Sequence, residues 1–271
     1  MSPQMTSLIL RPLPSIPVIQ QGDDLASIIL EACQIKKIHL KDGDILVITS
    51  KIISKAEGRL VNLMDITASD EAKALATRSG KDPRLADLIL KESRVVLRVR
   101  PGTVIVEHRL GFICANAGID HSNIAPPSGI QSHLSNKSGR GVSEWVLLLP
   151  VNPDRSAAGI RTKLEAATQK HLGVMIVDSH GRAWRLGVVG TCIGLSGLPA
   201  IVDKRGQKDL VGYTLQITLI AAADELAGAA SLVMGQADEG TPVVHVRGFP
   251  YSLREGSFSE LPRPIDEDMF R

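Results

Sequence analysis

Residues Ile176–Ile201 read IVDSHGRAWRLGVVGTCIGLSGLPAI, and Leu226–Gly240 read LAGAASLVMGQADEG. The first stretch predicts a buried strand that ends at Asp178, and the second predicts a helix of small residues. An aspartate that leaves a buried strand, with the Ser179 hydroxyl beside it and arginines nearby, supplies the groups that a metal-bridged phosphate site requires. The pattern therefore indicates an enzyme that uses a nucleotide.

Length and charge limit the classes of protein to consider. The chain has 271 residues, with 31 basic and 29 acidic side chains. This length fits one domain or two packed units, and the even charge argues against duplex nucleic acid or an anionic membrane as a partner. Three isolated cysteines and no apolar run of membrane-spanning length predict a soluble, cytoplasmic protein without disulfides.

Around this stretch, strands and capped helices are mixed without the regular alternation of a doubly wound sheet. We therefore predict an α+β fold, as a single domain over residues 1–271 or as two intimately packed subdomains. The Pro-, Gly- and Ser-rich segment 125–142 predicts a long flexible loop, and residues 250–271 predict a loosely packed tail. We expect strands at Asp44–Ser50 and in LQITLI, a hairpin across Pro101-Gly102, and helices capped by Asp23, Ser69, Asp82 and either Asp154 or Ser156.

Two aspartates follow apolar strands, Asp120 in NAGIDHSN and Asp178 in IVDSHGR. For one such aspartate, capping a turn or helix is the commoner role. Two of them in one chain, with Ser179 adjacent to the second, favour joint binding of one hard cation, because magnesium and manganese accept a few carboxylate oxygens and complete their shell with water and phosphate.

Basic groups near the predicted strand ends are candidate phosphate ligands. Lys51 and Lys55 share a helix face if SKIISKAEGR turns helical, and a solvated basic face is an equally good interpretation. Arg182 and Arg185 could clamp a phosphate or carboxylate, although surface arginines are commoner than clamps. No GxxxxGK[ST], GxSxG, HExxH or CxxC motif is present. For the glycines at 187, 190, 194 and 197, close helix packing is favoured over approach to a phosphate.

Five ordered blocks resemble the coenzyme F420:L-glutamate ligase (gamma-glutamyl ligase) family. They are VITSKIISKAEGR, FICANAGIDHSN, LLPVNPDRSA, VDSHGRAWRLGVVGTCIGLSGLPAIVDKRGQKDLVG and ADELAGAASLVMGQADEGTPVVHVRG. The resemblance covers about residues 16–248. It implies a GTP-dependent ligase that joins L-glutamate to the lactyl carboxylate of a deazaflavin precursor and then adds a second glutamate through its gamma-carboxyl. It also implies two Mg²⁺ or Mn²⁺ ions, K⁺, and an intertwined homodimer of family-specific fold with mixed and antiparallel sheets.

The resemblance assigns candidate site residues by position. The first metal falls on Asp120 and Asp178, and the second on Ser179 and Gln236. GTP contacts fall on Ile16, Pro17, Val18, Ile19, Ser50, Lys51, Lys55, Asn123, Met234, Gly235, Gln236, Ala237, Asp238, Glu239, Gly240 and Thr241.

Two features depart from the family pattern. Gln236 can be glutamate in relatives, and a neutral amide is a weaker ligand for a hard cation. The 125–142 loop is longer than the archaeal form. We expect the stand-alone form of the family, without the fused nitroreductase-like domain of some actinobacterial relatives. The implied chemistry moves the γ-phosphoryl group of GTP onto the acceptor carboxylate, and the resulting acyl phosphate is attacked by the glutamate amine, so no protein nucleophile is expected.

Three other functions remain open from the sequence. A gamma-glutamyl ligase could act on another acceptor, such as a folate. A module that only binds GTP would release no phosphate, and a metal-dependent phosphohydrolase would release it without glutamate. The sequence does not separate the acceptor variants (lactyl, dehydro or glyceryl), the number of glutamates added or the physiological metal.

Overall fold

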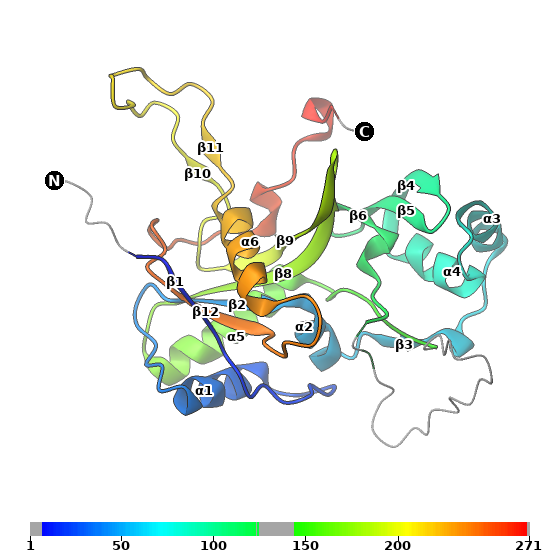
Figure 1. Cartoon of the computed structure of the whole chain (residues 1–271), viewed down its shortest axis with the longest axis horizontal. Coiled ribbons are helices and arrows are strands. Elements are labelled where there is room, and N and C mark those ends of the chain that lie inside the picture. The colour runs from blue at the N-terminus through cyan, green and yellow to red at the C-terminus, as the bar shows by residue number, and fades with distance from the viewer. Residues whose placement is uncertain (1–6, 123, 125–143, 270–271) are drawn as a thin grey trace. The chain divides into compact units, whose positions relative to one another are not determined.

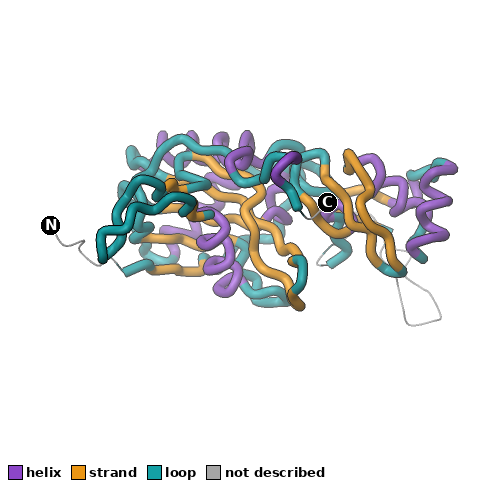
Figure 2. The backbone as a smooth tube through the Cα atoms, turned by 90° about the horizontal axis from the view of Figure 1, so that it is seen from above, coloured by secondary structure: helices purple, strands orange, loops and turns teal. Residues whose placement is uncertain are grey.

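The computed structural model describes residues 7–122, 124 and 144–269. The chain divides into two compact units, each described by itself. Unit 1 comprises Met1–Ile19, Asp23–Ile53 and Asn152–Pro264, and unit 2 comprises Gln20–Gly22, Ser54–Val151 and Ile265–Arg271. Both units contain helices and strands (Figure 2), and the α+β class is confirmed. The segment 125–142, predicted to be a flexible loop, lies outside the described residues.

Unit 1 is built on a five-stranded mixed sheet with the order β1-β12-β2-β8-β9 (Figure 1). Strands β2 and β8 are parallel, and the other neighbours are antiparallel. The apolar runs ILVIT and VVHVR form central strands because both of their faces are covered. The strands are β1 (Ile9–Pro12), β2 (Ile45–Thr49), β8 (Gly173–Arg182), β9 (Arg185–Ser196) and β12 (Val243–Arg247).

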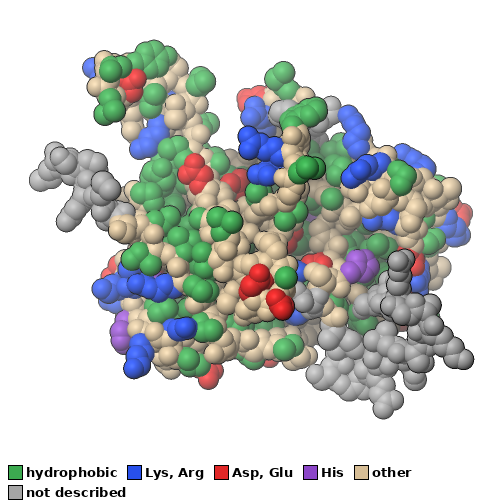
Figure 3. All heavy atoms as spheres, viewed as in Figure 1, with side chains coloured by type: hydrophobic (Ala, Val, Ile, Leu, Met, Phe, Trp, Pro, Cys, Tyr) green, Lys and Arg blue, Asp and Glu red, His purple; other side chains and the backbone are tan. Residues whose placement is uncertain are grey.

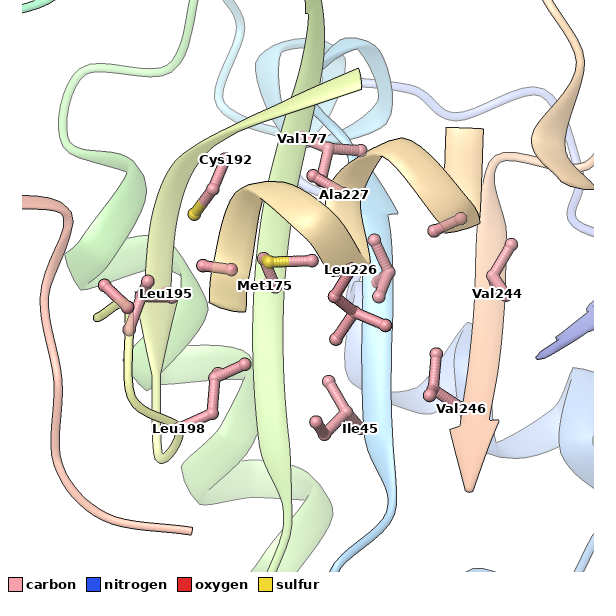
Figure 4. Close-up of a cluster of buried hydrophobic side chains, with 14 of the residues drawn as sticks. Ile45, Met175, Val177, Cys192, Leu195, Leu198, Leu226, Ala227, Val244 and Val246 are labelled. Carbon is pink, nitrogen blue, oxygen red and sulfur yellow. The ribbon is translucent and has the colours of Figure 1, made fainter. Parts of the chain in front are cut away.

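Helix α6 (Ala222–Met234) packs against β8, β9 and β12 and builds the main core of unit 1. Figure 4 shows it crossing the sheet, with Leu226 and Ala227 directed at side chains of β2, β8 and β9. The small residues of α6 let the helix pack close to the sheet. A glycine in the facing strand β9 is also needed for this packing, because a Cβ on Gly190 would lie 2.5 Å from the Ala227 carbonyl oxygen. Packing therefore explains Gly190, as the sequence favoured.

Two further helices belong to unit 1, α1 (Leu25–Ile35) and α5 (Pro153–Thr168). The caps of both helices differ from the prediction. The N-cap of α1 is Asp24 and not Asp23, and its side chain makes no capping hydrogen bond. In α5, Asn152 accepts from the Arg155 amide as N-cap, and Pro153 opens the helix. Asp154 instead accepts from the amides of Leu195 and Phe258, which are distant in sequence.

Other parts of unit 1 also depart from the expectations. Of the strand predicted for LQITLI, only the two residues of β11 (Leu219–Ile220) form a strand, paired with β10 (Val202–Asp203). The segment between them projects away from the core with its apolar side chains exposed.

The C-terminal segment is packed, although the sequence predicts a loose tail. Leu253 and Leu261 contact the main core, and the short helix η3 (Phe258–Glu260) carries a capping box.

Unit 2 has its own core, formed by two helices and two small antiparallel sheets. Ser69 caps α3, which ends at the left-handed Gly80, and Asp82 caps α4 with Pro83 in its first turn, as predicted. The predicted hairpin across Pro101-Gly102 is β4–β5. The elements are α3 (Asp70–Ser79), α4 (Pro83–Lys91), β3 (Leu60–Asn62), β7 (Trp145–Leu147), β4 (Ser93–Arg100), β5 (Thr103–His108), β6 (Ile113–Ala115), η1 (Leu63–Asp65), η2 (Asn116–Gly118) and η4 (Ile265–Glu267); α2 (Ser50–Ala56) spans the division between the units.

The cysteines Cys33, Cys114 and Cys192 are buried and form no disulfide. In the part of the chain that the structure describes, no helix combines the length and the apolar character needed to cross a membrane.

Candidate functional site

The sheet of unit 1 brings four separate chain segments to one of its edges. Because β2 and β8 are parallel, their carboxyl ends lie at the same edge. Strand β1 runs in the same direction, and the antiparallel β12 begins there. The edge therefore receives the residues after β1, the start of α2, the distal half of β8, and the loop between α6 and β12. Such carboxyl ends are the usual place for ligands in sheets with parallel strands.

Asp178 is the first residue of β8 beyond the end of β2, since Val177 still pairs with Thr49. Its Oδ1 accepts a 2.8 Å hydrogen bond from the buried Ser50 hydroxyl. Its Oδ2 lies 3.1 Å from His180 Nε2, and the two side chains are 17% and 10% exposed. The structure thus joins the polar residue that follows β2 to the aspartate of β8, which are 128 positions apart. The carboxylate is held in one orientation by hydrogen bonds to both oxygens.

Ser179 and Gln236 form a second pair at the same edge. The Ser179 hydroxyl donates to Gln236 Oε1 at 2.9 Å, and Gln236 Nε2 donates to the Ser231 hydroxyl at 2.8 Å. Successive side chains of a strand point to opposite faces, so Ser179 faces α6 while Asp178 faces away from it. The end of α6 and the middle of β8 together fix the Gln236 amide, with its carbonyl oxygen toward Ser179.

The loop from Met234 to Thr241 is held together by internal hydrogen bonds. Gly235 has a left-handed φ of 76°, and the Thr241 hydroxyl donates to the Met234 carbonyl oxygen at 2.8 Å, which closes the loop. The Glu239 carboxylate accepts from the Ala237 amide at 2.8 Å. Hydrogen bonds from the amides of Ala237, Glu239 itself and Gln236 lower the pKa of Glu239. This loop can hold an anionic oxygen with backbone groups alone.

Asp224, in the first turn of α6, is a half-buried carboxyl that the sequence did not single out. It accepts from the Cys192 amide at 2.9 Å. Burial raises the pKa of Asp224, and the Cys192 hydrogen bond and the charge of His180 oppose the shift. His180 and Ser231 were also missed as contacts of the site. For His180 the signal was present, because residues two apart on a strand share a face.

Asp120 lies in unit 2, so the joint cation site with Asp178 stays a prediction. Its backbone pairs with Leu147, and its Oδ1 accepts from the Ser122 amide and hydroxyl at 2.7 and 2.9 Å. Lys55 is also in unit 2, while Lys51 is half-buried in unit 1. Asn123 lies outside the described residues.

The oxygen donors of unit 1 suit a hard cation. Within residues 7–122, 124 and 144–269, no three His, Cys, Asp or Glu side chains gather to hold a metal ion. The Asp178 carboxylate, the Ser179 hydroxyl and the Gln236 carbonyl are nevertheless oxygen ligands of the kind that Mg²⁺ and Mn²⁺ accept, and neighbouring side chains orient each of them. Because Asp178 and Ser179 point to opposite faces of β8, they belong to two separate sets of ligands. Each set fits a cation that takes its remaining ligands from water and a phosphate.

The predicted end of β8 at Asp178 is wrong, because the β8–β9 hairpin continues to Arg182. Arg182 and Arg185 face each other at its tip, four residues or about 13 Å along the strand from Asp178. Arg182 donates to the Leu186 carbonyl oxygen at 3.1 Å, and both arginines are exposed. Their role as substrate or phosphate ligands stays a prediction.

Comparison with known proteins gives a consistent result. Residues 14–248 match the family model described as F420-0:Gamma-glutamyl ligase. The chain is 43% identical to "Coenzyme F420:L-glutamate ligase" of Methanopyrus kandleri, over 98% of this chain and 99% of the relative. It is 45% identical to the protein of that name from Methanothermobacter thermautotrophicus, over 94% and 96% of the two chains. For the Archaeoglobus fulgidus protein the identity is 40%, over 96% and 95%.

Proposed function

The chain belongs to the F420-0:gamma-glutamyl ligase family, and from that premise we propose that it is a GTP-dependent coenzyme F420:L-glutamate ligase. It joins L-glutamate to the lactyl carboxylate of the deazaflavin precursor and then adds a second glutamate through a gamma-linked amide. Each ligation releases GDP and phosphate. The cytoplasm is the proposed location.

One observation supports the proposal most strongly. Three of the segments assigned to GTP by resemblance, Ile16–Ile19, Ser50–Lys51 and Met234–Thr241, belong to unit 1, and the strand directions place all three at the edge that carries Asp178. They are separated by long stretches of sequence. Their common location is explained if one extended ligand, a nucleoside triphosphate, contacts them all.

The chemistry begins with phosphoryl transfer, because a carboxylate is a poor electrophile. An oxygen of the acceptor carboxylate attacks the γ-phosphorus, and the bond from that phosphorus to the β–γ bridging oxygen breaks, which gives GDP and an acyl phosphate. The amine of glutamate then attacks the acyl carbon, the amide forms, and phosphate leaves while the amine loses a proton. Such transfers depend on positioning and charge neutralisation more than on covalent work by the protein.

The residues assigned to the site by resemblance have separate tasks in this scheme. Lys51 and Lys55 position the triphosphate, and the amides of the Met234–Thr241 loop hold phosphate oxygens. Asp120 and Asp178 would hold the first of two Mg²⁺ or Mn²⁺ ions, Ser179 and Gln236 the second, and K⁺ would also be required. When bound, these ions neutralise charge on the phosphate oxygens. Ser50 and His180 keep the Asp178 carboxylate in place.

No cysteine acts as a nucleophile in this mechanism. Cys192 is buried, and burial raises the pKa of its thiol well above the usual value. Cys114 is buried in unit 2. A thiol that is neutral and shielded from substrate is inert.

A homodimer forms part of the proposal. Two projecting segments of unit 1, the tip of the β8–β9 hairpin and the excursion between β10 and β11 (Figure 1), expose several large apolar side chains. These are Trp184, Leu186, Leu210, Val211 and Ile217, each at least 87% exposed. Large apolar side chains exposed on projecting segments favour burial against another chain. Light scattering of the purified protein should give twice the 29.0 kDa chain mass, and a monomer at micromolar concentration would contradict this part.

The test of the function is a product assay. The protein is incubated with GTP, Mn²⁺, L-glutamate and the deazaflavin precursor, and mass spectrometry and phosphate release are followed together. We expect species with one and two added glutamates and one phosphate per amide. Phosphate release without glutamate would indicate a hydrolase. GTP binding without turnover would indicate a sensor. Product formed from a folate acceptor, and none from the deazaflavin precursor, would indicate a different ligase.

The variant Asp178→Asn should lower kcat by about 10² to 10³, or about 2.7–4 kcal/mol, as when one main electrostatic group is removed. The Ser50 hydroxyl can still donate to the amide oxygen, so the melting temperature should change little. Asp203→Asn is a suitable control, because Asp203 is exposed on β10 in the same unit and pairs with Arg205. Near-normal turnover of Asp178→Asn would remove this residue from the mechanism.

A further inference from the structure

The end of the unit 1 sheet opposite the candidate site carries a pocket of about 510 Å³ with a basic lining. Its walls are the loop after α1, the last two residues of the edge strand β1 and the end of β12. The lining residues are Arg11, Pro12, Lys36, Lys37, Ile38, His39, Lys41 and Arg247. Five of these eight side chains are Lys or Arg, and none is acidic. Figure 3 shows Lys and Arg side chains gathered at the left edge of the molecule, where the loop after α1 meets β1 and β12 in Figure 1.

The pocket is separate from the nucleotide edge. Strand β2 connects them, with Asp44 immediately before it and Ser50 immediately after it. Six residues of extended chain span about 20 Å. A ligand in the pocket and a ligand on Asp178 can therefore be bound at the same time.

The Arg247 side chain of the pocket is held in position by hydrogen bonds. Arg247 donates to both oxygens of the buried Asp44, at 2.8 and 2.6 Å, and to the His39 carbonyl oxygen at 2.8 Å. His245 lies against the same carboxylate at 2.9 Å. Burial raises the pKa of Asp44, but hydrogen bonds from Arg247 and His245 outweigh it and leave the pKa below the usual value. The guanidinium is thus fixed in position before any ligand arrives.

Among the residues that the structure describes, no carboxylate neutralises the charges of the other four cationic side chains of the pocket. Across the described residues, Arg11, Lys36, Lys37 and Lys41 have no carboxylate within ion-pair distance. The turn that presents two of them is ordered by backbone bonds, from the Lys36 amide to Ala32 and from the Lys37 amide to Gln34, with Lys37 at a left-handed φ of 54°. The charge of Arg247 is neutralised by Asp44, so four positive charges remain around the cavity. The net charge of the whole chain is only +2.

We propose that this pocket binds a small anion that carries several phosphate groups. The volume is in the range of small-molecule sites. Four clustered cations match a linear triphosphate, whose charges are spaced along a short chain, and lysine and arginine are the side chains that bind phosphate. The lining has no Phe, Tyr or Trp ring, and its one imidazole, His39, stands among five Lys and Arg side chains, so recognition rests mainly on the phosphates. The source can be free polyphosphate or the tail of a nucleotide.

The test is calorimetric titration of the full chain with sodium tripolyphosphate at constant ionic strength and without divalent metal. We expect saturable binding, weakened at least tenfold (1.4 kcal/mol) in Lys36→Gln/Lys37→Gln. The control Lys204→Gln/Lys208→Gln removes the same charge from the β10–β11 segment of the same unit and should bind like the parent. Lys36, Lys37 and Lys208 are exposed, and Lys204 is half-buried with its ammonium over the Tyr251 ring. Unchanged melting temperatures will show that both pairs fold.

The arms of the experiment separate the sources and the alternatives. If the parent protein binds two equivalents of GTP, and Lys36→Gln/Lys37→Gln binds one and keeps its ligase activity, the ligand of the pocket is the phosphate tail of a nucleotide. Binding of tripolyphosphate but not GTP at the pocket identifies free polyphosphate. Equal loss of affinity in both lysine pairs, no saturable binding, or equally tight binding of tetraglutamate would overturn the proposal.

Discussion

Because Gly190 has no side chain, α6 can pack close to the sheet. Gly190→Ala should therefore destabilise the protein. A Cβ at this position would lie 2.5 Å from the Ala227 carbonyl oxygen and 2.5 Å from the Ser231 Cβ. Carbon atoms prefer separations of about 3.5 Å or more, so α6 would have to retreat by about 1 Å. Both obstacles are held by the helix itself, and neither is the end of a flexible side chain.

The expected cost lies at the upper end of the range for overpacked cores, about 3 kcal/mol. For a chain of this size that corresponds to a fall in melting temperature of about 6–12 °C. Gly181→Ala is the matched control, because Gly181 lies in the same hairpin and a Cβ there meets nothing within 4 Å. Its stability should change by less than about 0.5 kcal/mol.

Urea melts of the two variants measure the difference. Since Ser179 pairs with Gly190 across the hairpin and contacts Gln236 at the end of α6, a retreat of α6 should also weaken GTP binding in Gly190→Ala. If Gly190→Ala is as stable as Gly181→Ala and binds GTP as well, the close contact between α6 and β9 does not support the site.

Two other predictions concern the buried carboxyl group of Asp44 and the half-buried one of Asp224. Asp44→Asn leaves Arg247 and His245 without their charged partner, so urea melts at pH 7 should show a loss of about 3 kcal/mol; a loss below 1 kcal/mol would mean that this ion cluster does not support the sheet. Burial raises the pKa of Asp224, so the folded state binds a proton more readily than the unfolded state, and stability should rise as the pH falls from 7 toward the unfolded pKa. Asp224→Asn keeps an acceptor for the Cys192 amide and should lose that part of the pH dependence, and identical pH profiles for the parent and the variant would contradict the assignment.

Local signals in the sequence predicted the elements that depend on local interactions. Helices α3 and α4 follow from the Ser69 cap, Gly80 and Asp82-Pro83, and the β4–β5 hairpin follows from Pro101-Gly102. The errors arose where distant residues decide. Asp154 has the form of a helix cap but binds the amides of Leu195 and Phe258.

The same division applies to the candidate site. Asp178 and Ser179 were singled out by the strand-end pattern and Gln236 by the family resemblance, and the structure brings the last two into contact. The contact between Ser50 and Asp178 depends on the parallel pairing of β2 with β8, which no local pattern encodes. Asp224 was missed because an acidic residue in the first turn of a helix usually serves only the helix dipole.

A crystal of the protein grown with a non-hydrolysable GTP analogue and Mn²⁺ tests the central claim most directly. Anomalous scattering should place manganese at the Asp178 carboxylate, bridged to Asp120 and to phosphate oxygens, with the triphosphate along the edge formed by Ser50 and the Met234–Thr241 loop. Nucleotide bound elsewhere, or manganese without contact to Asp178, would contradict the account.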